Sequence, residues 1–302
     1  MEWMQKRGVE VFLLAHTNHV SNHPMVVPPE RFQLGGKINE VARKFQVDVV
    51  HIHWLILLEW FHIGELTAGL DFPLTVRGHS FDFTVERTFR VSSFDSVHKI
   101  WLFPHYAEKA AHVSTKVASL SACYDFGVFQ PGLSDGKVVR AAAGLEDKDI
   151  EGFLSVARLC PERRFELIVT RAFKPEGYPE RLARLASDNV TVKVNLQREE
   201  VAKAMSTASF CLRGSDESAH QFGMPVSVIE AMGCGVTPIL PDLPAAHSYA
   251  GSAAFYYKTM EEAVEILRVG AARKEEAIEM AKRYKTDVVL PEVISEWERL
   301  AR

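Results

Sequence analysis

The sequence repeats one unit along most of its length: a short apolar run rich in β-branched residues, then a segment whose apolar positions recur at helical spacing. Such runs are typical of strands in a parallel sheet that helices cover on both faces. They predict strands at 9–14, 47–53, 73–78, 98–103 and 115–120, and again at 138–143, 165–169, 190–194, 209–213, 237–241 and 253–257. The expected fold class is therefore α/β with doubly wound sheets.

The segments between these strands predict the covering helices. They fall at about 37–45, 56–69, 81–91, 105–112, 148–159, 177–186, 198–206 and 225–234. From Met260 the sequence is helical and charged to its end, and its last helical stretch is PEVISEWERLAR, behind Pro291.

The stretch FGVFQPGLSDGK (126–137) interrupts the alternation, and its glycines and proline are typical of a linker. A length of 302 residues also favours two domains. We therefore expect two Rossmann-like domains, over 1–130 and 131–285, followed by a C-terminal helix over 286–302 that packs back on the first domain. Domains of this kind bind ligands beyond the carboxyl ends of their strands, so two that face each other form a cleft.

Composition excludes several classes of function. A formal charge of −4 gives no basic surface for nucleic acid. Four scattered cysteines without a CxxC pair indicate a reduced, cytoplasmic chain without a zinc framework. The longest apolar run, Trp54–Leu58, is too short for a membrane span, and no signal peptide opens the chain. The phosphate motifs GxxxxGK[ST] and GxGxxG and the nucleophile motif GxSxG are absent.

The segment QFGMPVSVIEAMGCGVTPILPD (221–242) carries the strongest chemical signal. Pro225 suits the first turn of the predicted helix, and Gly233 and Gly235 suit its end. Phosphate at this helix start would meet the free backbone N–H groups within Met224 to Ser227, except at Pro225, which has none. It would also meet the positive end of the helix dipole. Glu230, one turn further, could accept hydroxyl protons from a ribose. The alternative is an exposed glutamate between ordinary turns.

This segment resembles the donor-binding signature of the GT-B glycosyltransferases, family 4 above all, roughly E-G-(F/M)-P-x-x-x-(L/I)-E-A-M-A-x-G-x-P-V. The shared positions are Gly223, Pro225, Glu230, Ala231, Met232, Gly235 and Pro238. The α/β alternation, linker and C-terminal helix extend the resemblance over nearly the whole chain. It implies a GT-B fold and a retaining transfer of sugar from a nucleoside diphosphate donor, with no metal and no cofactor.

The chain departs from this pattern in two places. The family has a first glutamate eight positions before the second, associated with the transferred sugar, and here that position is Phe222. The nearby polar residues that could replace it are Asp216, Glu217 and His220. The family's first domain also opens with a strand and a glycine-rich turn, whereas EWMQKRG is typical of the end of a helix. We expect the first strand to be missing from this domain.

Two more segments match the resemblance, each after a predicted strand. RGHSFDF (77–83) is similar to a family segment whose histidine faces the donor sugar, which makes His79 the candidate catalytic residue, as a hydrogen-bond partner or a charge relay. Family members also place an arginine and a lysine after the first strand of the second domain. Lys148 matches the lysine, whereas Arg140 lies within the strand, too early for the usual spacing.

Other residues allow a structural interpretation. His51 and His53 share one strand face and could begin a metal site, but no third ligand is nearby in sequence. A loop after the first predicted strand carries three histidines that could contact an acceptor: His16, His19 and His23. Arg198 opens an ordinary predicted helix, near a loop where family members often hold the base.

Three functions follow from these observations. The first is a retaining glycosyltransferase whose acceptor is a hydroxyl group of a carbohydrate, of a lipid-linked molecule or of another compound. The second is a catalytically degenerate nucleotide- or glycan-binding module of the same fold, which Phe222 and the short first domain favour. A nucleotide-sugar epimerase ranks last because no acid/base carboxylate pair stands out. The cytoplasmic chain lacks a strong basic amphipathic stretch, although relatives with lipid acceptors attach peripherally to membranes.

Overall fold

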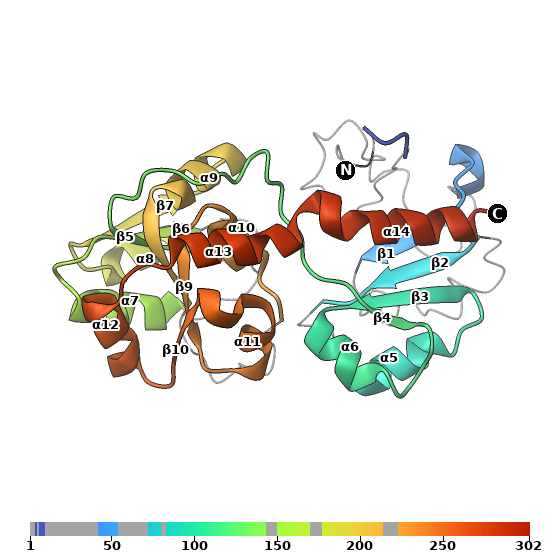
Figure 1. Cartoon of the computed structure of the whole chain (residues 1–302), viewed down its shortest axis with the longest axis horizontal. Coiled ribbons are helices and arrows are strands. Elements are labelled where there is room, and N and C mark those ends of the chain that lie inside the picture. The colour runs from blue at the N-terminus through green and yellow to red at the C-terminus, as the bar shows by residue number, and fades with distance from the viewer. Residues whose placement is uncertain are drawn as a thin grey trace. The chain divides into compact units, whose positions relative to one another are not determined.

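The computed structural model describes Met4 and residues 6–9, 42–53, 72–79, 83–142, 150–169, 177–213 and 223–302. The chain divides into two compact units, each built around one sheet (Figure 1). Unit 1 comprises Met1–Leu102, Ala107–Ser119 and Val293–Arg302, and unit 2 comprises Phe103–Tyr106 and Leu120–Glu292.

Unit 1 contains a sheet of parallel strands in the order β1-β2-β3-β4. Their bounds are Val50–His53, Leu74–Arg77, Val97–Leu102 and Val117–Ser119. The predicted strands at 47–53, 73–78, 98–103 and 115–120 are thus confirmed, whereas 9–14 and the helix at 56–69 fall almost wholly outside the described residues. Helix α5 (Val85–Ser92) and the unit 1 part of α6 (Pro104–Ala110), from Ala107 on, lie on one side of this sheet. The unit 1 part of α14 (Thr286–Leu300), from Val293 on, lies on the other side (Figure 1).

Unit 2 contains a sheet of parallel strands in the order β10-β9-β8-β5-β6-β7. The strands are β5 (Lys137–Ala142), β6 (Phe165–Val169), β7 (Val190–Val194), β8 (Ala208–Leu212), β9 (Thr237–Pro241) and β10 (Phe255–Tyr257). The chain moves outward from β5 to β7, returns to place β8 beside β5, and then moves outward the other way. The order therefore reverses between β5 and β8, where doubly wound sheets bind ligands.

Helices pack on both faces of this second sheet. They are α7 (Ile150–Leu159), α8 (Tyr178–Leu185), α9 (Arg198–Ser206), α10 (Val226–Gly233), α11 (Pro244–Ala250), α12 (Met260–Val269) and α13 (Lys274–Ala281). α12 packs against α7, and their core residues cluster with Leu167 and Phe210 of the sheet. α10 packs against α9 and α13. The predicted α/β, doubly wound fold class is confirmed.

Three elements differ from the sequence-based expectation. Helix α11 was not predicted, because a helix of seven residues rich in alanine has no apolar periodicity to reveal it. β10 begins at Phe255, because Gly251–Ala253 forms a short 3-10 turn. The C-terminal helix expected over 286–302 is α14, but Pro291, which was expected to open the last helical stretch, lies inside it. α14 begins at Thr286 and tolerates Pro291 in its interior, with the loss of one backbone hydrogen bond.

The end of α10 is a Schellman motif built on Gly235. Gly235 has φ +78°, its N–H donates to Met232 O at 2.9 Å, and the Val236 N–H donates to Ala231 O at 3.0 Å. Gly233, inside the same helix, lies against the Tyr124 ring, so a Cβ there would be 2.8 Å from Tyr124 Cζ. The family pattern has alanine at this position, and the packed tyrosine explains why this chain has glycine.

Gly233→Ala is therefore expected to lower the free energy of unfolding by about 1–3 kcal/mol, since the added methyl group overlaps a buried ring. Urea denaturation of the variant measures the change. The same substitution in a Tyr124→Leu background should have a much smaller effect. Equal effects in both backgrounds would show that the ring is not the cause.

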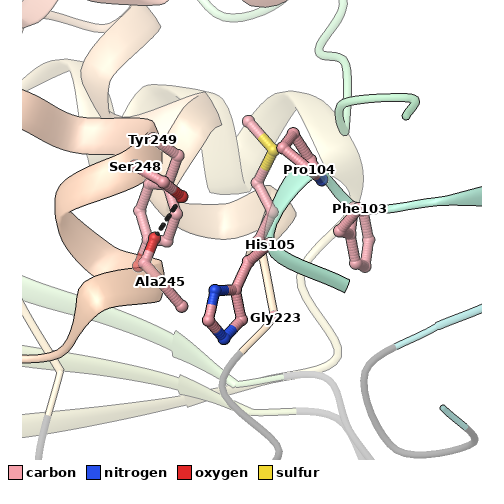
Figure 2. Close-up of a pocket in the computed structure, with 8 residues that line it drawn as sticks. Phe103, Pro104, His105, Gly223, Ala245, Ser248 and Tyr249 are labelled. Carbon is pink, nitrogen blue, oxygen red and sulfur yellow. Dashed lines mark hydrogen bonds between the residues drawn. The ribbon is translucent and has the colours of Figure 1, made fainter. Parts of the chain in front are cut away.

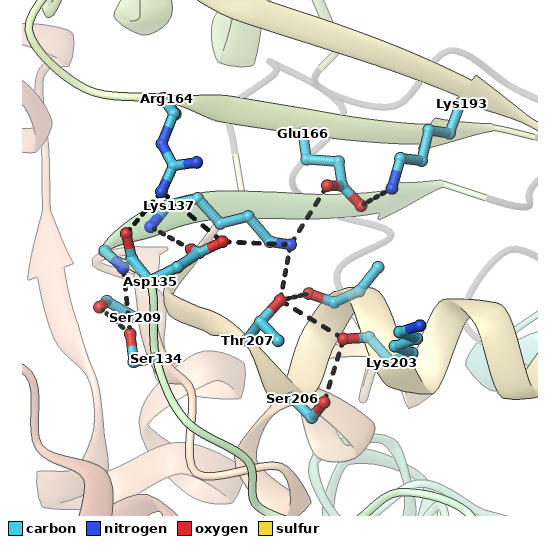
Figure 3. A network of polar contacts seen from close by, with 12 residues as sticks. Ser134, Asp135, Lys137, Arg164, Glu166, Lys193, Lys203, Ser206, Thr207 and Ser209 are labelled. Atoms are coloured by element: carbon cyan, nitrogen blue, oxygen red, sulfur yellow. Dashed lines mark hydrogen bonds and ion pairs between the residues drawn. The ribbon is translucent and has the colours of Figure 1, made fainter.

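A network of buried charges lies at the amino-terminal ends of β5 and β6 (Figure 3). The Glu166 carboxylate is 3.2 Å from Lys137 Nζ and 3.1 Å from Lys193 Nζ, and Lys137 Nζ also donates to Thr207 Oγ1 at 2.7 Å. Glu166 and Lys137 are both buried, whereas Lys193 is partly exposed. This network is at the edge of the sheet opposite to the carboxyl ends, so we assign it to stability.

None of the helices in the described part of the chain is long and apolar enough to cross a membrane. All four cysteines lie in that part, and each is a free thiol. Cys160, Cys211 and Cys234 are buried.

Candidate functional site

The start of α10 lies at the carboxyl edge of the unit 2 sheet. Pro225 is the N-cap residue, one position before the first helical residue, and its carbonyl accepts hydrogen bonds from the N–H groups of Val228 and Ile229 at 3.1 and 3.3 Å. The N–H groups of Val226 and Ser227 lie in the first turn, so the helix itself contains no carbonyl oxygen to which they could donate. Gly223 and Met224 are buried beside this open end. The five residues predicted from sequence, 223–227, thus form one continuous helix start.

Glu230 lies one turn further along α10 and is half-buried. Burial raises the pKa of its carboxyl to about 7, and the Arg198 guanidinium opposes this rise. Arg198 is the first residue of α9, where it also stacks over the Phe129 ring at 5.5 Å. From the sequence, Arg198 was an ordinary helix start near a loop where family members often hold the base. Its proximity to Glu230 could not be predicted, because it arises from the packing of α9 on α10.

The free energy of unfolding is expected to fall as pH rises from about 4.5 to about 7, because the folded chain holds the Glu230 proton more tightly than the unfolded chain does. Glu230→Gln removes this dependence. At pH 8 the variant should be more stable than the wild type by roughly 1–3 kcal/mol, and near pH 4.5 the two should be close. Urea denaturation at both pH values measures the difference.

Glu265, which is exposed on α12, provides the control. Glu265→Gln should leave the pH profile of the wild type unchanged. If Glu230→Gln is no more stable than the wild type at pH 8, the carboxyl of Glu230 ionises without the expected penalty of burial.

Two buried arginines lie where the strand order reverses. Arg140 is in β5 and is 3% exposed, and Arg213 directly follows β8 and is 7% exposed. Arg140 Nη1 donates to Ala141 O at 2.6 Å. The Arg213 N–H donates to Ile239 O at 3.0 Å, and the Tyr257 hydroxyl donates to Arg213 O. Arg213 was not singled out from sequence, although its place at the end of a predicted strand put it at the ligand edge.

A small pocket adjoins the start of α10 (Figure 2). All of its lining residues belong to unit 2: Phe103, Pro104, His105, Gly223, Met224, Ala245, Ser248 and Tyr249. Ser248 Oγ donates to Ala245 O at 2.7 Å, which turns that hydroxyl toward its own helix. The backbone N–H of Ala122 donates to Met224 Sδ at 3.2 Å and fixes the thioether at the helix start.

In unit 1, three histidines gather at the carboxyl ends of β1 and β2. The His53 ring is 4.6 Å from the His79 ring and 5.9 Å from the His51 ring, between centroids. The sequence offered no third imidazole beside His51 and His53, and the fold supplies His79. Even so, no group of three or more His, Cys, Asp or Glu side chains in the described part of the chain is placed to hold a metal ion.

These imidazoles are neutral at pH 7. Burial lowers the pKa of His51 and His79 to about 3 and that of His53 to about 4, and the charge of the buried Arg77 guanidinium adds to the effect. His51 Nδ1 is 3.0 Å from Thr75 Oγ1, which also accepts a hydrogen bond from Trp297 Nε1 at 3.1 Å. A neutral His79 suits a hydrogen bond to a sugar hydroxyl better than a relay of charge.

Several predicted site residues fall outside the described part of the chain and stay predictions. They are the diphosphate lysine Lys148, the candidate sugar contacts Asp216, Glu217 and His220, the departure Phe222, and the loop histidines His16, His19 and His23.

Comparison with known proteins identifies the fold. No protein-family model matches the sequence, and a search of curated proteins finds no match. Among solved structures, HepE of Anabaena in complex with UDP-glucose has a TM-score of 0.70 at 12% identity, over 99% of this chain and 88% of that one. Sucrose-phosphate synthase from Thermosynechococcus elongatus has a TM-score of 0.66 at 14% identity, over 92% of this chain and 81% of that one.

AviGT4, a glycosyltransferase involved in avilamycin A biosynthesis, has a TM-score of 0.59 at 16% identity, over 93% of this chain and 81% of that one. At such low identities these similarities establish the fold and leave substrates open. Two α/β units with parallel sheets, matched over nearly the whole chain, give this protein the fold of the GT-B glycosyltransferases.

Proposed function

We propose that the chain is a glycosyltransferase that moves a sugar from a nucleoside diphosphate donor to an acceptor hydroxyl with retention of the anomeric configuration. The observation that carries the proposal is the carboxyl edge of the unit 2 sheet of a GT-B fold: α10 has an open start and a half-buried glutamate, and two buried arginines lie in β5 and directly after β8. HepE, with the same fold, was solved with UDP-glucose, and pneumococcal GtfA was solved with UDP and GlcNAc.

The donor contacts follow from the chemistry of these residues. The N–H groups at the start of α10, together with Lys148 and Arg140, hold the diphosphate, and Glu230 accepts hydrogen bonds from the ribose hydroxyls. His79, as a neutral imidazole, bonds to a hydroxyl of the donor sugar. Phe222 stands where the family has a sugar-contacting glutamate. We propose that Asp216, Glu217 and His220 make the other sugar contacts instead.

In the reaction, the bond between the anomeric carbon and the phosphate oxygen breaks, and the acceptor oxygen bonds to the same face. The acceptor proton passes to the departing phosphate oxygen. Negative charge that develops on the diphosphate is stabilised by the helix start and the cations. This scheme needs neither a metal nor a cofactor, and we propose that the enzyme works in the cytoplasm, on a free acceptor or at the membrane surface.

The test combines binding with product chemistry. Calorimetry should detect binding of at least one of UDP, GDP and ADP, and proton NMR of the product formed from the matching donor should show the anomeric coupling of the donor. An inverted coupling would refute retention while leaving the transfer intact. If none of the three nucleotides binds, the proposed donor class is wrong.

The second candidate is a nucleotide- or glycan-binding module without catalysis, favoured by Phe222 at the position of the sugar-contacting glutamate. Such a module would bind a nucleoside diphosphate and would leave the sugar donor uncleaved. Measurable release of diphosphate from any sugar donor excludes it.

A further inference from the structure

Tyr249 of α11 carries a buried hydroxyl without a hydrogen-bond partner. The residue is 3% exposed, and its phenol oxygen makes no hydrogen bond in the structure. Three other tyrosines of unit 2 are satisfied. Tyr257 donates to Arg213 O, Tyr256 donates to Gly251 O at 2.7 Å, and Tyr284 donates to the backbone oxygen of Tyr249 itself at 3.0 Å. An unsatisfied buried hydroxyl destabilises a fold, so its presence needs an explanation.

The surroundings of this hydroxyl are cationic. Burial raises the pKa of the Tyr249 phenol, and the positive charges of Arg213 and Arg140 oppose that rise. Both arginines are more than nine-tenths buried, and no described carboxylate is among the groups that act on the phenol. The side chain also lines the pocket beside Gly223 and Met224, at the start of α10. A buried hydrogen-bond donor that feels the charge of two buried guanidinium groups suits an oxyanion.

We propose that the Tyr249 hydroxyl and the Arg213 guanidinium, together with Arg140, form an anion site that binds the diphosphate of the donor. The hydroxyl donates to a non-bridging phosphate oxygen, and the guanidinium groups balance the charge. The assignment rests on the proposed function, which it extends by two residues that lie outside the sequence motif. It also explains the unsatisfied hydroxyl, because the partner of Tyr249 is then the ligand.

Inorganic pyrophosphate is the probe for this site, measured by calorimetry on the full-length chain beside UDP, GDP and ADP. Tyr249→Phe should weaken pyrophosphate binding by about 10-fold and should keep or raise the melting temperature, because it removes a hydroxyl that the free protein leaves unsatisfied. Tyr256→Phe is the matched control. It removes a hydroxyl that is hydrogen-bonded, so it should lower the melting temperature and leave pyrophosphate binding unchanged.

Arg213→Gln should weaken pyrophosphate binding by at least about 10-fold, and Arg213→Lys, which keeps the charge, should restore part of it. If these variants do not fold, Tyr249→Phe decides alone. Wild-type affinity in Tyr249→Phe would overturn the anion site, and so would a loss of melting temperature as large as that of Tyr256→Phe.

The same titrations separate this inference from the proposed function. If the wild type binds pyrophosphate through Tyr249 but binds none of the nucleotides, the anion site stands and the donor assignment fails. If a nucleoside diphosphate binds equally well to the wild type and to Tyr249→Phe and Arg213→Gln, the donor assignment stands and the anion site fails.

Discussion

Glu166→Ala is expected to lower the free energy of unfolding by about 3–5 kcal/mol, because it removes the nearest and, among the described residues, only buried carboxylate that pairs with the buried ammonium of Lys137. Lys137 keeps its hydrogen bond to Thr207 Oγ1 and the partly exposed carboxylate of Asp135 at 4.0 Å, but neither replaces the buried carboxylate 3.2 Å away. Urea denaturation at pH 7, followed by circular dichroism, measures the change. The effect is large because the carboxylate serves two lysines at once (Figure 3).

Lys193 supplies the matched control for this network. Its side chain is 39% exposed, so Lys193→Ala should lower the stability by less than about 1 kcal/mol. The double variant Lys137→Met, Glu166→Leu removes both buried charges together and should recover most of the stability lost in Glu166→Ala. If Glu166→Ala were no more destabilising than Lys193→Ala, the buried pair would not be a determinant of the fold.

Glu230→Ala is expected to weaken the binding of a nucleoside diphosphate by about 10- to 100-fold, the range for hydrogen bonds to a charged group. Above pH 7 the carboxylate is largely ionised and accepts from the ribose hydroxyls. Calorimetry at pH 8 with the nucleotide that binds the wild type measures the loss.

Two comparisons make the Glu230 result specific. Inorganic pyrophosphate lacks a ribose, so its affinity should be the same for Glu230→Ala and for the wild type. Glu265→Ala, an exposed change on α12, should bind the nucleotide as the wild type does. Unchanged nucleotide affinity in Glu230→Ala would remove this residue from the donor site.

Local sequence was sufficient for most of the fold. The strands at 165–169, 190–194 and 237–241 and the helix at 198–206 have the predicted bounds, because each apolar run or helical segment ends at polar or turn residues. α9 also has Glu200 three residues after Gln197, and the Glu200 carboxylate accepts a hydrogen bond from the Gln197 backbone N–H at 2.7 Å. Pro291 was expected to open the last helical stretch, since proline usually marks a helix start, and here it lies inside α14.

The site was less predictable, because its residues meet through strand order and helix packing. Glu230 and the start of α10 lie in one motif, so the sequence could place them together. Arg213 and Arg140 are neighbours only because β8 returns beside β5, and Tyr249 lies on α11, which had no sequence signal. The burial that raises the pKa of Glu230 to about 7 is likewise a property of tertiary packing.

The most direct test of the account is the turnover of sugar donors. The full-length chain is incubated with UDP-, GDP- and ADP-sugars, and the nucleoside diphosphate released by transfer or by slow hydrolysis is measured against a control without protein. We predict release from at least one donor, with a clear reduction in Glu230→Ala. If no donor is cleaved and none of the corresponding nucleotides binds, the assignment of this GT-B fold to sugar transfer is contradicted.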